Sequence, residues 1–212
     1  MENKEYKIAE SYQNVSVAIE SANIEIKSSL DNETKVVVEE NKINACDCYV
    51  ENDVLTVTRK KRKWYSFLLP SFKAPQLTIF LPQKNVNYLH IKCKTGRIAV
   101  SDININGEVD VKTNTTKTKI YNVCCNSLAI KGNTAKFNLE KVRVVDKLNV
   151  KTNTGKIILN DCSANEILIK TNTGNIESSS LNYKSMFVKS NTGKIKMPNT
   201  LESSDTKIIS DK

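Results

Sequence analysis

Alternating apolar and polar residues form short runs along the whole chain. Val15-Ser-Val17-Ala-Ile19 and Leu77-Thr-Ile79-Phe-Leu81 have the period of two that marks a strand with one buried face. Shorter runs of the same kind occupy residues 24–26, 36–38 and 55–57, and polar turns separate them. The pattern therefore predicts an all-β protein with many turns.

One unit of about twenty residues recurs six times from Leu89 onward. The fourth and fifth copies read Leu148-Asn-Val-Lys-Thr-Asn-Thr-Gly155 and Ile167-Leu-Ile-Lys-Thr-Asn-Thr-Gly174, and the other copies follow the same template. The last positions of successive copies are separated by 20, 19, 20, 19 and 19 residues. Two short strands cannot bury an apolar face alone, whereas stacked copies share a continuous interior. This regular period predicts a parallel β-solenoid with one copy per coil.

Each copy is expected to run as strand, tight corner, strand and looser polar connection, as at residues 160–166. Asn-Thr-Gly supplies the corner, because glycine tolerates a positive φ. The second copy departs from the template at residues 116–120, where we expect two extra residues in a local bulge. One predicted inner column is Ile91, Val111, Ile130, Val150, Ile169 and Val188, and the other is Ile98, Phe137, Ile157, Ile176 and Ile195.

Residues 6–82 have the same alternation without the repeated motif. We interpret them as an irregular first section of the same stack, because terminal repeats are commonly atypical and cap an exposed edge. No Gly/Ser-rich linker separates them from the regular coils at 89–212. The prediction is one single-domain parallel β-solenoid over residues 1–212, with 19–20 residues per coil.

The N-terminal sequence and the lengths of the apolar runs predict where in the cell the protein is located. The N-terminus lacks a secretory signal, and no apolar run approaches the roughly 20 residues that span a bilayer. We therefore expect a cytoplasmic protein that can lie at the inner face of the membrane. In that setting the six cysteines are expected to be reduced, buried thiols. Their spacing predicts no metal site, and the only histidine, His90, is expected to face outward on a strand. No cofactor is predicted.

Over residues 10–210 the chain combines alternating N-terminal strands, the segment Leu77-Thr-Ile-Phe-Leu-Pro82, and tandem coils of the type hydrophobic-x-hydrophobic-x-Thr/Ser-x-x-Gly-x-Ile. This arrangement resembles the bacterial putative-adhesin, domain-of-unknown-function family of β-solenoid proteins. The resemblance implies the solenoid fold and a setting at the envelope or in stress responses. It implies no catalytic residues.

Lysine follows the inner residue in all six copies, and a second basic row follows the corner in five of them. The first row, here called the lysine ladder, is Lys92, Lys112, Lys131, Lys151, Lys170 and Lys189. The second basic row is Arg97, Lys117, Lys136, Lys156 and Lys194. Between them run the amide row, Asn114, Asn133, Asn153, Asn172 and Asn191, and six threonines, Thr95, Thr115, Thr134, Thr154, Thr173 and Thr192, which are expected to stabilise the corners by hydrogen bonding. The ladder either keeps the strand surface soluble or binds a regular polyanion.

A basic and aromatic segment interrupts the N-terminal strands at residues 59–73. Cations beside Trp, Phe and Leu are typical of segments that lie at a membrane interface. The favoured alternative is an arm whose apolar residues cover the solenoid or a partner subunit. The candidate residues are Arg59, Lys60, Lys61, Arg62, Lys63, Trp64, Tyr65, Phe67, Leu68, Leu69 and Phe72.

No motif of an enzyme is present, and the outward acids Asp110, Asp161, Glu166 and Glu177 occupy different coil positions. We therefore expect a non-catalytic binding or scaffold module. Its expected partner is an anionic membrane surface or envelope polymer, whereas nucleic acid is disfavoured because no aromatic residues interleave with the lysines. The alternatives are a structural protein that self-assembles through solenoid ends or residues 59–73, and, less favoured, a polysaccharide-active enzyme.

Overall fold

The computed structural model describes residues 2–40, 45–59, 74–83, 86–198 and 205–210. These residues form strands and no helix, so none of them belongs to a helix that could span a membrane. The strands are β1 (Glu2–Ile8), β2 (Asn14–Ser28), β3 (Thr34–Glu40), β4 (Cys46–Glu51), β5 (Val54–Arg59), β6 (Gln76–Leu81), β7 (Tyr88–Asn104), β8 (Glu108–Thr134), β9 (Lys136–Thr154), β10 (Ile157–Asn160), β11 (Cys162–Thr173), β12 (Ile176–Ser178), β13 (Leu181–Thr192), β14 (Ile195–Lys196) and β15 (Asp205–Ser210).

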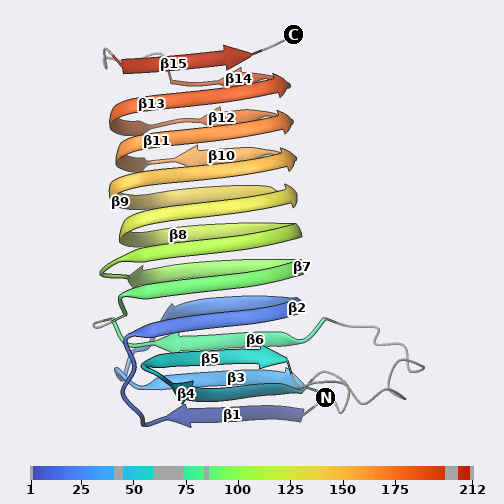
Figure 1. Ribbon diagram of the computed structural model, residues 1–212, viewed down its shortest axis with the longest axis vertical. Coiled ribbons are helices and arrows are strands. Elements are labelled where there is room, and N and C mark those ends of the chain that lie inside the picture. The colour runs from blue at the N-terminus through green and yellow to red at the C-terminus, as the bar shows by residue number, and fades with distance from the viewer. Residues whose placement is uncertain (1, 41–44, 60–73, 84–85, 199–204, 211–212) are drawn as a thin grey trace, which may run out of the picture.

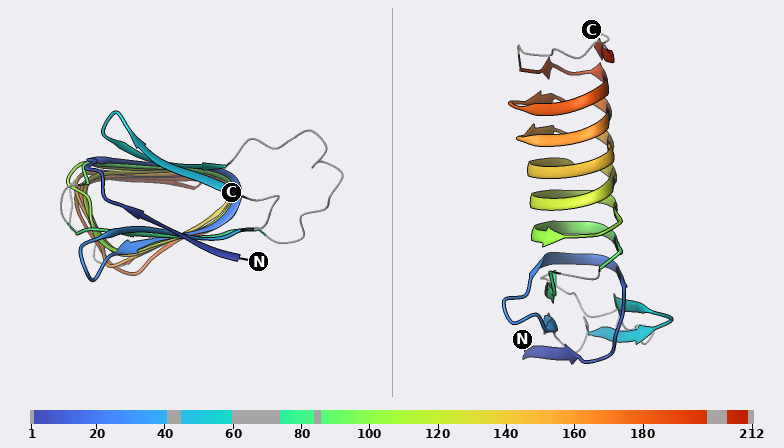
Figure 2. Two further views of the ribbon diagram at one scale, coloured as in Figure 1. Left: turned by 90° about the horizontal axis from the view of Figure 1, so that it is seen from below. Right: turned by 90° about the vertical axis from the view of Figure 1, so that its left-hand side faces the viewer.

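The strands lie one above another along the long axis of the molecule, with β1 at one end and β15 at the other (Figure 1). Seen along that axis, the coils form a flattened loop with two long sides (Figure 2). β2, β7, β8 and β9 pair in parallel in this order, and β11, β13 and β15 extend one side of the stack. The predicted parallel β-solenoid is confirmed.

The interior is filled by the predicted columns with one exception. All six residues of the first column have 0% exposure. In the second column Ile98, Phe137, Ile157 and Ile176 are buried. Ile195 also lies in its predicted column, opposite Ile176, and packs against the core, but it is only partly buried. It belongs to the two-residue strand β14, which pairs with β12 and with no later strand among the described residues.

Glycine closes the predicted corners. Gly96 and Gly155 have φ angles of +129° and +140°, a region that side-chain-bearing residues rarely adopt. A Cβ atom on Gly155 would lie 2.0 Å from the carbonyl oxygen of Ala135 in the neighbouring coil. Inward hydroxyls hold the same corners, because Thr152 Oγ1 donates to the carbonyl of Asn133 at 3.0 Å. The corner motif therefore allows both close stacking and hydrogen-bonded carbonyls.

The prediction of a bulge at residues 116–120 is wrong, because the strand continues through them without an extra residue. Ile98 pairs with Thr118, and the residues on both sides pair one to one. Thr118 is 2% exposed, and its Oγ1 atom lies 3.2 Å from Oγ1 of Thr116. The two hydroxyls satisfy each other, so threonine can occupy an apolar column without an inserted residue. Register shifts occur instead at residues 125–127 and 163–166.

The supposed loose connection at residues 160–166 is largely a third wall of the coil. β11 begins at Cys162, and Cys162 and Ala164 are 2% and 5% exposed. Val123 and Val142 occupy the matching place in earlier coils and have 0% exposure. This wall follows a second corner, at which Asp102, Asn122, Lys141 and Asp161 have φ angles of 54°, 51°, 55° and 51°.

The regular coils begin earlier in the chain than residue 89, where the sequence repeat starts. β2 pairs with β7 in parallel from Asn14, opposite Tyr88, to Lys27, opposite Ser101. Ala22 lies opposite Gly96 and so takes the place of the corner glycine. Residues 14–28 are thus a regular coil, and the prediction of an irregular section holds only for the strands beyond them.

The next coil is divided between two strands. β5 pairs in parallel with β2 up to Thr58, opposite Ala18, and β6 resumes at Gln76, opposite Asn23. β1 and β3 then close this end through antiparallel pairs, β1 with β3 and β3 with β6, while β4 pairs antiparallel with β5. The prediction of an atypical cap at the N-terminal end is confirmed in these strands.

Candidate anion-binding site

The lysine ladder follows neighbouring strands on one long side of the solenoid. Lys92 pairs with Lys112, and Lys131, Lys151, Lys170 and Lys189 pair in succession. Lys151 and Lys189 are half-buried, and the other four lysines are exposed. Because each lysine lies directly opposite the next, the ladder places like charges at the shortest spacing that a sheet allows.

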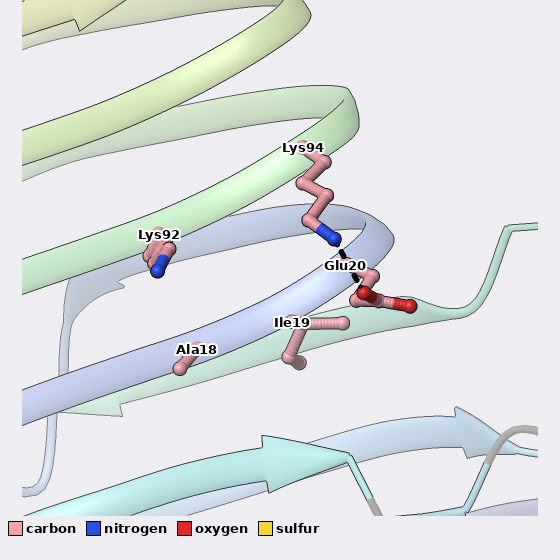
Figure 3. A pocket seen from close by; sticks show the side chains of 5 residues that line it. All are labelled: Ala18, Ile19, Glu20, Lys92 and Lys94. Atoms are coloured by element: carbon pink, nitrogen blue, oxygen red, sulfur yellow. Dashed lines mark hydrogen bonds and ion pairs between the residues drawn. The ribbon is translucent and has the colours of Figure 1, made fainter.

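Carboxylates pair with two lysines of this surface, Lys112 in the ladder and Lys94 beside it. Lys112 Nζ lies 2.7 Å from Asp110 Oδ2, and Asp110 raises the pKa of Lys112. Lys94, beside the ladder, pairs with Glu20 at 2.6 Å. Figure 3 shows this pair at a hollow of about 240 Å³ that Ala18, Ile19, Glu20, Lys92 and Lys94 line.

The middle of the ladder has no such compensation. Within the described part of the chain, no carboxylate pairs with Lys131, Lys151 or Lys170. The Nζ atom of Lys170 instead lies 4.9 Å from the ring centroid of Phe187. Burial, and then the charges of Lys170, Lys131 and Lys147, lower the pKa of Lys151. Lys151 is therefore a cation that its burial and its neighbours destabilise, and a bound anion would stabilise it.

A groove of about 620 Å³ runs beside these lysines, with the amide row as its other side. Asn153 Nδ2 donates to Asn133 Oδ1, and Asn172 Nδ2 donates to Asn153 Oδ1, both at 2.9 Å. The prediction that these amides hydrogen-bond at the corners is confirmed for these three residues. The groove lining is Lys112, Thr113, Lys131, Gly132, Asn133, Lys151, Thr152, Asn153, Lys170, Thr171 and Asn172.

The outward threonines of the corners are also aligned. Thr95 pairs with Thr115, and Thr134, Thr154, Thr173 and Thr192 follow one another. They form the rim between the two basic rows.

The second basic row lies across that rim, beside a separate groove of about 460 Å³ that includes Arg97, Lys117 and Lys136. Lys156 in this row pairs with Glu177 at 2.6 Å, and Lys156 lowers the pKa of Glu177. Lys194 donates its backbone N–H to Asn175 Oδ1 at 3.0 Å. The two rows are thus two surfaces. Among the described residues no carboxylate pairs with Arg97, Lys117 or Lys136 either, but the ladder contains the lysine with a lowered pKa, Lys151.

The basic and aromatic segment lies outside the described residues, except for Arg59, the last residue of β5. Its described flanks, Thr58 and Gln76, pair with Ala18 and Asn23 of β2. The segment therefore joins the stack at the edge where other coils have their Asn-Thr-Gly corners.

A charged cluster that the sequence did not predict surrounds Asp110. Asp110 is 7% exposed. His90 Nδ1 lies 3.3 Å from Asp110 Oδ2 but forms no hydrogen bond with it. The ring of His90 stacks on Tyr88 with centroids 6.2 Å apart. His90 occupies the outward position that was predicted for it. The one-to-one pairing of His90 with Asp110 could have been read from the aligned repeats, which place both one position before the inner residue.

The six cysteines form no disulfide among the described residues, and they are largely buried, as predicted, with one exception. Cys46, Cys93, Cys125 and Cys162 are buried and Cys48 is half-buried, whereas Cys124 is exposed. Burial raises the pKa of Cys125 to about 12 and that of Cys162 to about 11. In the described residues no three metal-binding side chains gather at one place.

Residues 12–211 match the family described as Toastrack DUF4097, which confirms the resemblance inferred from the sequence. A putative adhesin from Bacteroides fragilis has a similar structure, with 17% identity, a TM-score of 0.53, and coverage of 92% of this chain and 95% of that chain. A putative adhesin from Parabacteroides distasonis has 14% identity and a TM-score of 0.60, with coverage of 92% and 96%. Similarity at this identity shows a common fold. No curated protein matches the chain.

Proposed function

Since this chain belongs to the Toastrack DUF4097 family, a domain family of unknown function, we propose its function from its own surface. It is a non-catalytic binding module whose lysine ladder holds a row of anionic groups, on an envelope polymer or on an anionic membrane surface. The name adhesin, which two similar structures carry, is consistent with binding without chemistry.

The observation that carries this proposal is the run of Lys131, Lys151 and Lys170 without a carboxylate partner in the described chain. Like charges directly opposite each other on a sheet are destabilising. A solubilising surface would be served equally well by alternating signs, as at Lys147 and Glu166, which pair at 2.7 Å. Three adjacent cations in a groove instead create the positive potential that attracts a polyanion.

Nucleic acid is a weaker partner for this surface. Single-stranded nucleic acids bind through aromatic platforms interleaved with cations. Beside the three unpaired lysines, the described residues offer one aromatic ring, that of Phe187.

The proposal is tested by removing charge from the ladder and from a matched control surface. A Lys131→Gln, Lys151→Gln, Lys170→Gln variant should lose binding to acidic polysaccharide and to vesicles with anionic lipid, measured by co-sedimentation. A Lys7→Gln, Lys119→Gln, Lys196→Gln variant has the same net charge and should bind like the unmodified protein. Binding by the unmodified protein should weaken as salt is added. Equal loss in both variants would show that net charge alone matters and would refute a ladder site.

Membrane contact through the basic and aromatic segment stays a sequence-based proposal. A Trp64→Ala, Phe67→Ala variant separates it from the ladder. If the segment carries membrane contact, this variant loses vesicle binding and keeps polysaccharide binding. If vesicle binding is unchanged, the segment has no such role.

End-to-end assembly is a second candidate, favoured by the C-terminal end of the stack. Ile208 of β15 lies opposite the buried Val188, yet it is 41% exposed. Among the described strands β15 pairs only with β13, whereas antiparallel strands close the opposite end. If this end assembles, light scattering should rise with protein concentration and an Ile208→Lys variant should remain monomeric. A monomer at all concentrations excludes this candidate.

A further inference from the structure

The spacing of the lysine ladder restricts the ligands that can lie along it. Hydrogen-bonded strands stand about 4.8 Å apart, so the ladder presents one cation at each such step. Lys131, Lys151 and Lys170 are paired partners in adjacent coils. Because the coils stack along the long axis of the molecule (Figure 1), the three lysines follow one another in that direction. A polymer with one anion per unit of about this length can pair with all three lysines together.

The groove also distinguishes a single chain from a membrane. Lysines form one side of it and the amide row forms the other, so a ligand lying between them contacts both. A planar layer of headgroups would contact the exposed lysine tips first and would not fill the groove. The shape therefore favours one extended chain that runs along the stack.

The amide row favours a ligand with hydroxyl groups. Asn153 gives one amide hydrogen to Asn133 and accepts one hydrogen bond from Asn172. Its second amide hydrogen and the second lone pair of Oδ1 stay available, because an amide has two donors and two acceptor sites. Phosphates and carboxylates only accept hydrogen bonds, whereas a sugar hydroxyl both donates and accepts. Repeated amides beside repeated lysines thus match alternating hydroxyl and acidic groups.

The opposite border of the ladder is partly apolar. Leu168 and Phe187 pair with each other, two residues before Lys170 and Lys189 and on the same face, and both are half-buried. Sugar rings expose C–H faces that can pack on such side chains, while a polyphosphate has none.

We propose, on the basis of the function proposed above, that the ladder binds a linear polyuronate, an acidic glycan with one carboxylate per sugar. The chain lies parallel to the solenoid axis. Its carboxylates pair with Lys131, Lys151 and Lys170, and its hydroxyls exchange hydrogen bonds with Asn133, Asn153 and Asn172.

Calorimetric titration of the full chain with a defined oligogalacturonate tests this proposal. Oligomers of L-glutamate and inorganic polyphosphate of matched charge serve as anions without sugar hydroxyls, and the methyl-esterified oligogalacturonate serves as a sugar without charge. Lys151→Gln should weaken oligogalacturonate binding roughly fivefold or more. Asn153→Ala should weaken oligogalacturonate binding and leave binding of the other two anions unchanged. Lys119→Gln and Asn104→Ala, which change exposed residues elsewhere, are the matched controls, and thermal unfolding verifies that each variant is folded.

Three outcomes separate the two proposals. Selective oligogalacturonate binding that depends on both Lys151 and Asn153 supports the polyuronate. Equal binding of all three anions with no effect of Asn153→Ala overturns the polyuronate and leaves the polyanion function standing. No binding of any anionic probe overturns both.

Discussion

The ring of Phe137 fills the space that a side chain at position 132 would occupy. A Cβ atom on Gly132 would lie 2.7 Å from Phe137 Cζ and 2.7 Å from Ala135 Cβ. The next coil has Thr152 opposite Gly132 and Ile157 opposite Phe137. The coil therefore combines the large side chain of Phe137 with glycine at position 132, so the volume of side chains in this layer stays close to that of the next layer.

Gly132→Ala should consequently destabilise the protein by about 1–3 kcal/mol, the usual cost of overpacking. The measurement is the free energy of unfolding in denaturant. A Gly132→Ala, Phe137→Leu variant should recover part of the loss, because the shorter side chain vacates the space. A second loss that simply adds to the first would contradict this pairing.

Gly155→Ala should behave differently. Its φ angle of +140° is unfavourable for alanine, and the new Cβ atom would lie 2.0 Å from the backbone oxygen of Ala135. Backbone atoms cannot move aside as a side-chain ring can, so we expect a larger loss than for Gly132→Ala. Truncating nearby side chains should not restore stability in the same unfolding assay.

Lys151→Gln should stabilise the fold while it weakens anion binding. The folded state lowers the pKa of Lys151, which means that the charged form is less favourable in the folded protein than in the unfolded chain. Below that pKa, removal of the charge should raise the free energy of unfolding by a few tenths to about 1 kcal/mol. The gain should shrink in high salt, and Lys7→Gln should show none. A loss of stability in low salt would show that Lys151 is not under repulsion.

Thiol labelling should divide the six cysteines by exposure. Cys124 should react rapidly with a disulfide reagent in the folded protein, since it is the exposed thiol. Cys125 is buried with its pKa raised to about 12, and it should react only on unfolding. A Cys124→Ser variant should lack the rapid phase. A rapid phase that persists in this variant would place a second thiol at the surface.

The free energy of unfolding should decline in alkaline solution, because the buried thiols of Cys125 and Cys162 ionise less readily than in the unfolded chain. Thiols of the unfolded chain ionise near pH 9, whereas burial raises the pKa of Cys162 to about 11 and that of Cys125 to about 12. Above pH 9 the unfolded state loses protons that the folded state keeps, so the free energy of unfolding falls as pH rises toward those values. Urea unfolding between pH 8 and 10.5 measures the slope. A Cys125→Ala, Cys162→Ala variant should show a shallower decline.

The repeat predicts the fold because one residue type recurs at one place in every coil. Inner Val and Ile residues, the corner glycines and the lysines are all found where the alignment of copies places them. The third wall was missed because Cys162-Ser-Ala164 is small and half polar, so its alternation is weak. β2 was missed as a regular coil because Ala22 replaces the glycine that marks the motif.

The candidate site could be predicted only in outline. Alternation places Lys112 and Lys131 on one surface, but it does not show that Asp110 neutralises the first and leaves the second without an acid. That difference depends on which side chains on neighbouring strands point toward each other. The groove depends in turn on the hydrogen bonds between Asn133, Asn153 and Asn172, which fix their side chains in one direction.

The divided coil of β5 and β6 shows how this architecture can acquire new parts. Thr58 and Gln76 pair with Ala18 and Asn23, so residues 59–75 separate two positions that only residues 19–22 separate in β2. A corner of the solenoid thus accepts an insertion while the neighbouring coil of β2 stays regular. Foreign peptides could therefore be grafted between Thr154 and Lys156, or at the same place in other coils. The choice of coil would set the position of the peptide along the long axis of the solenoid.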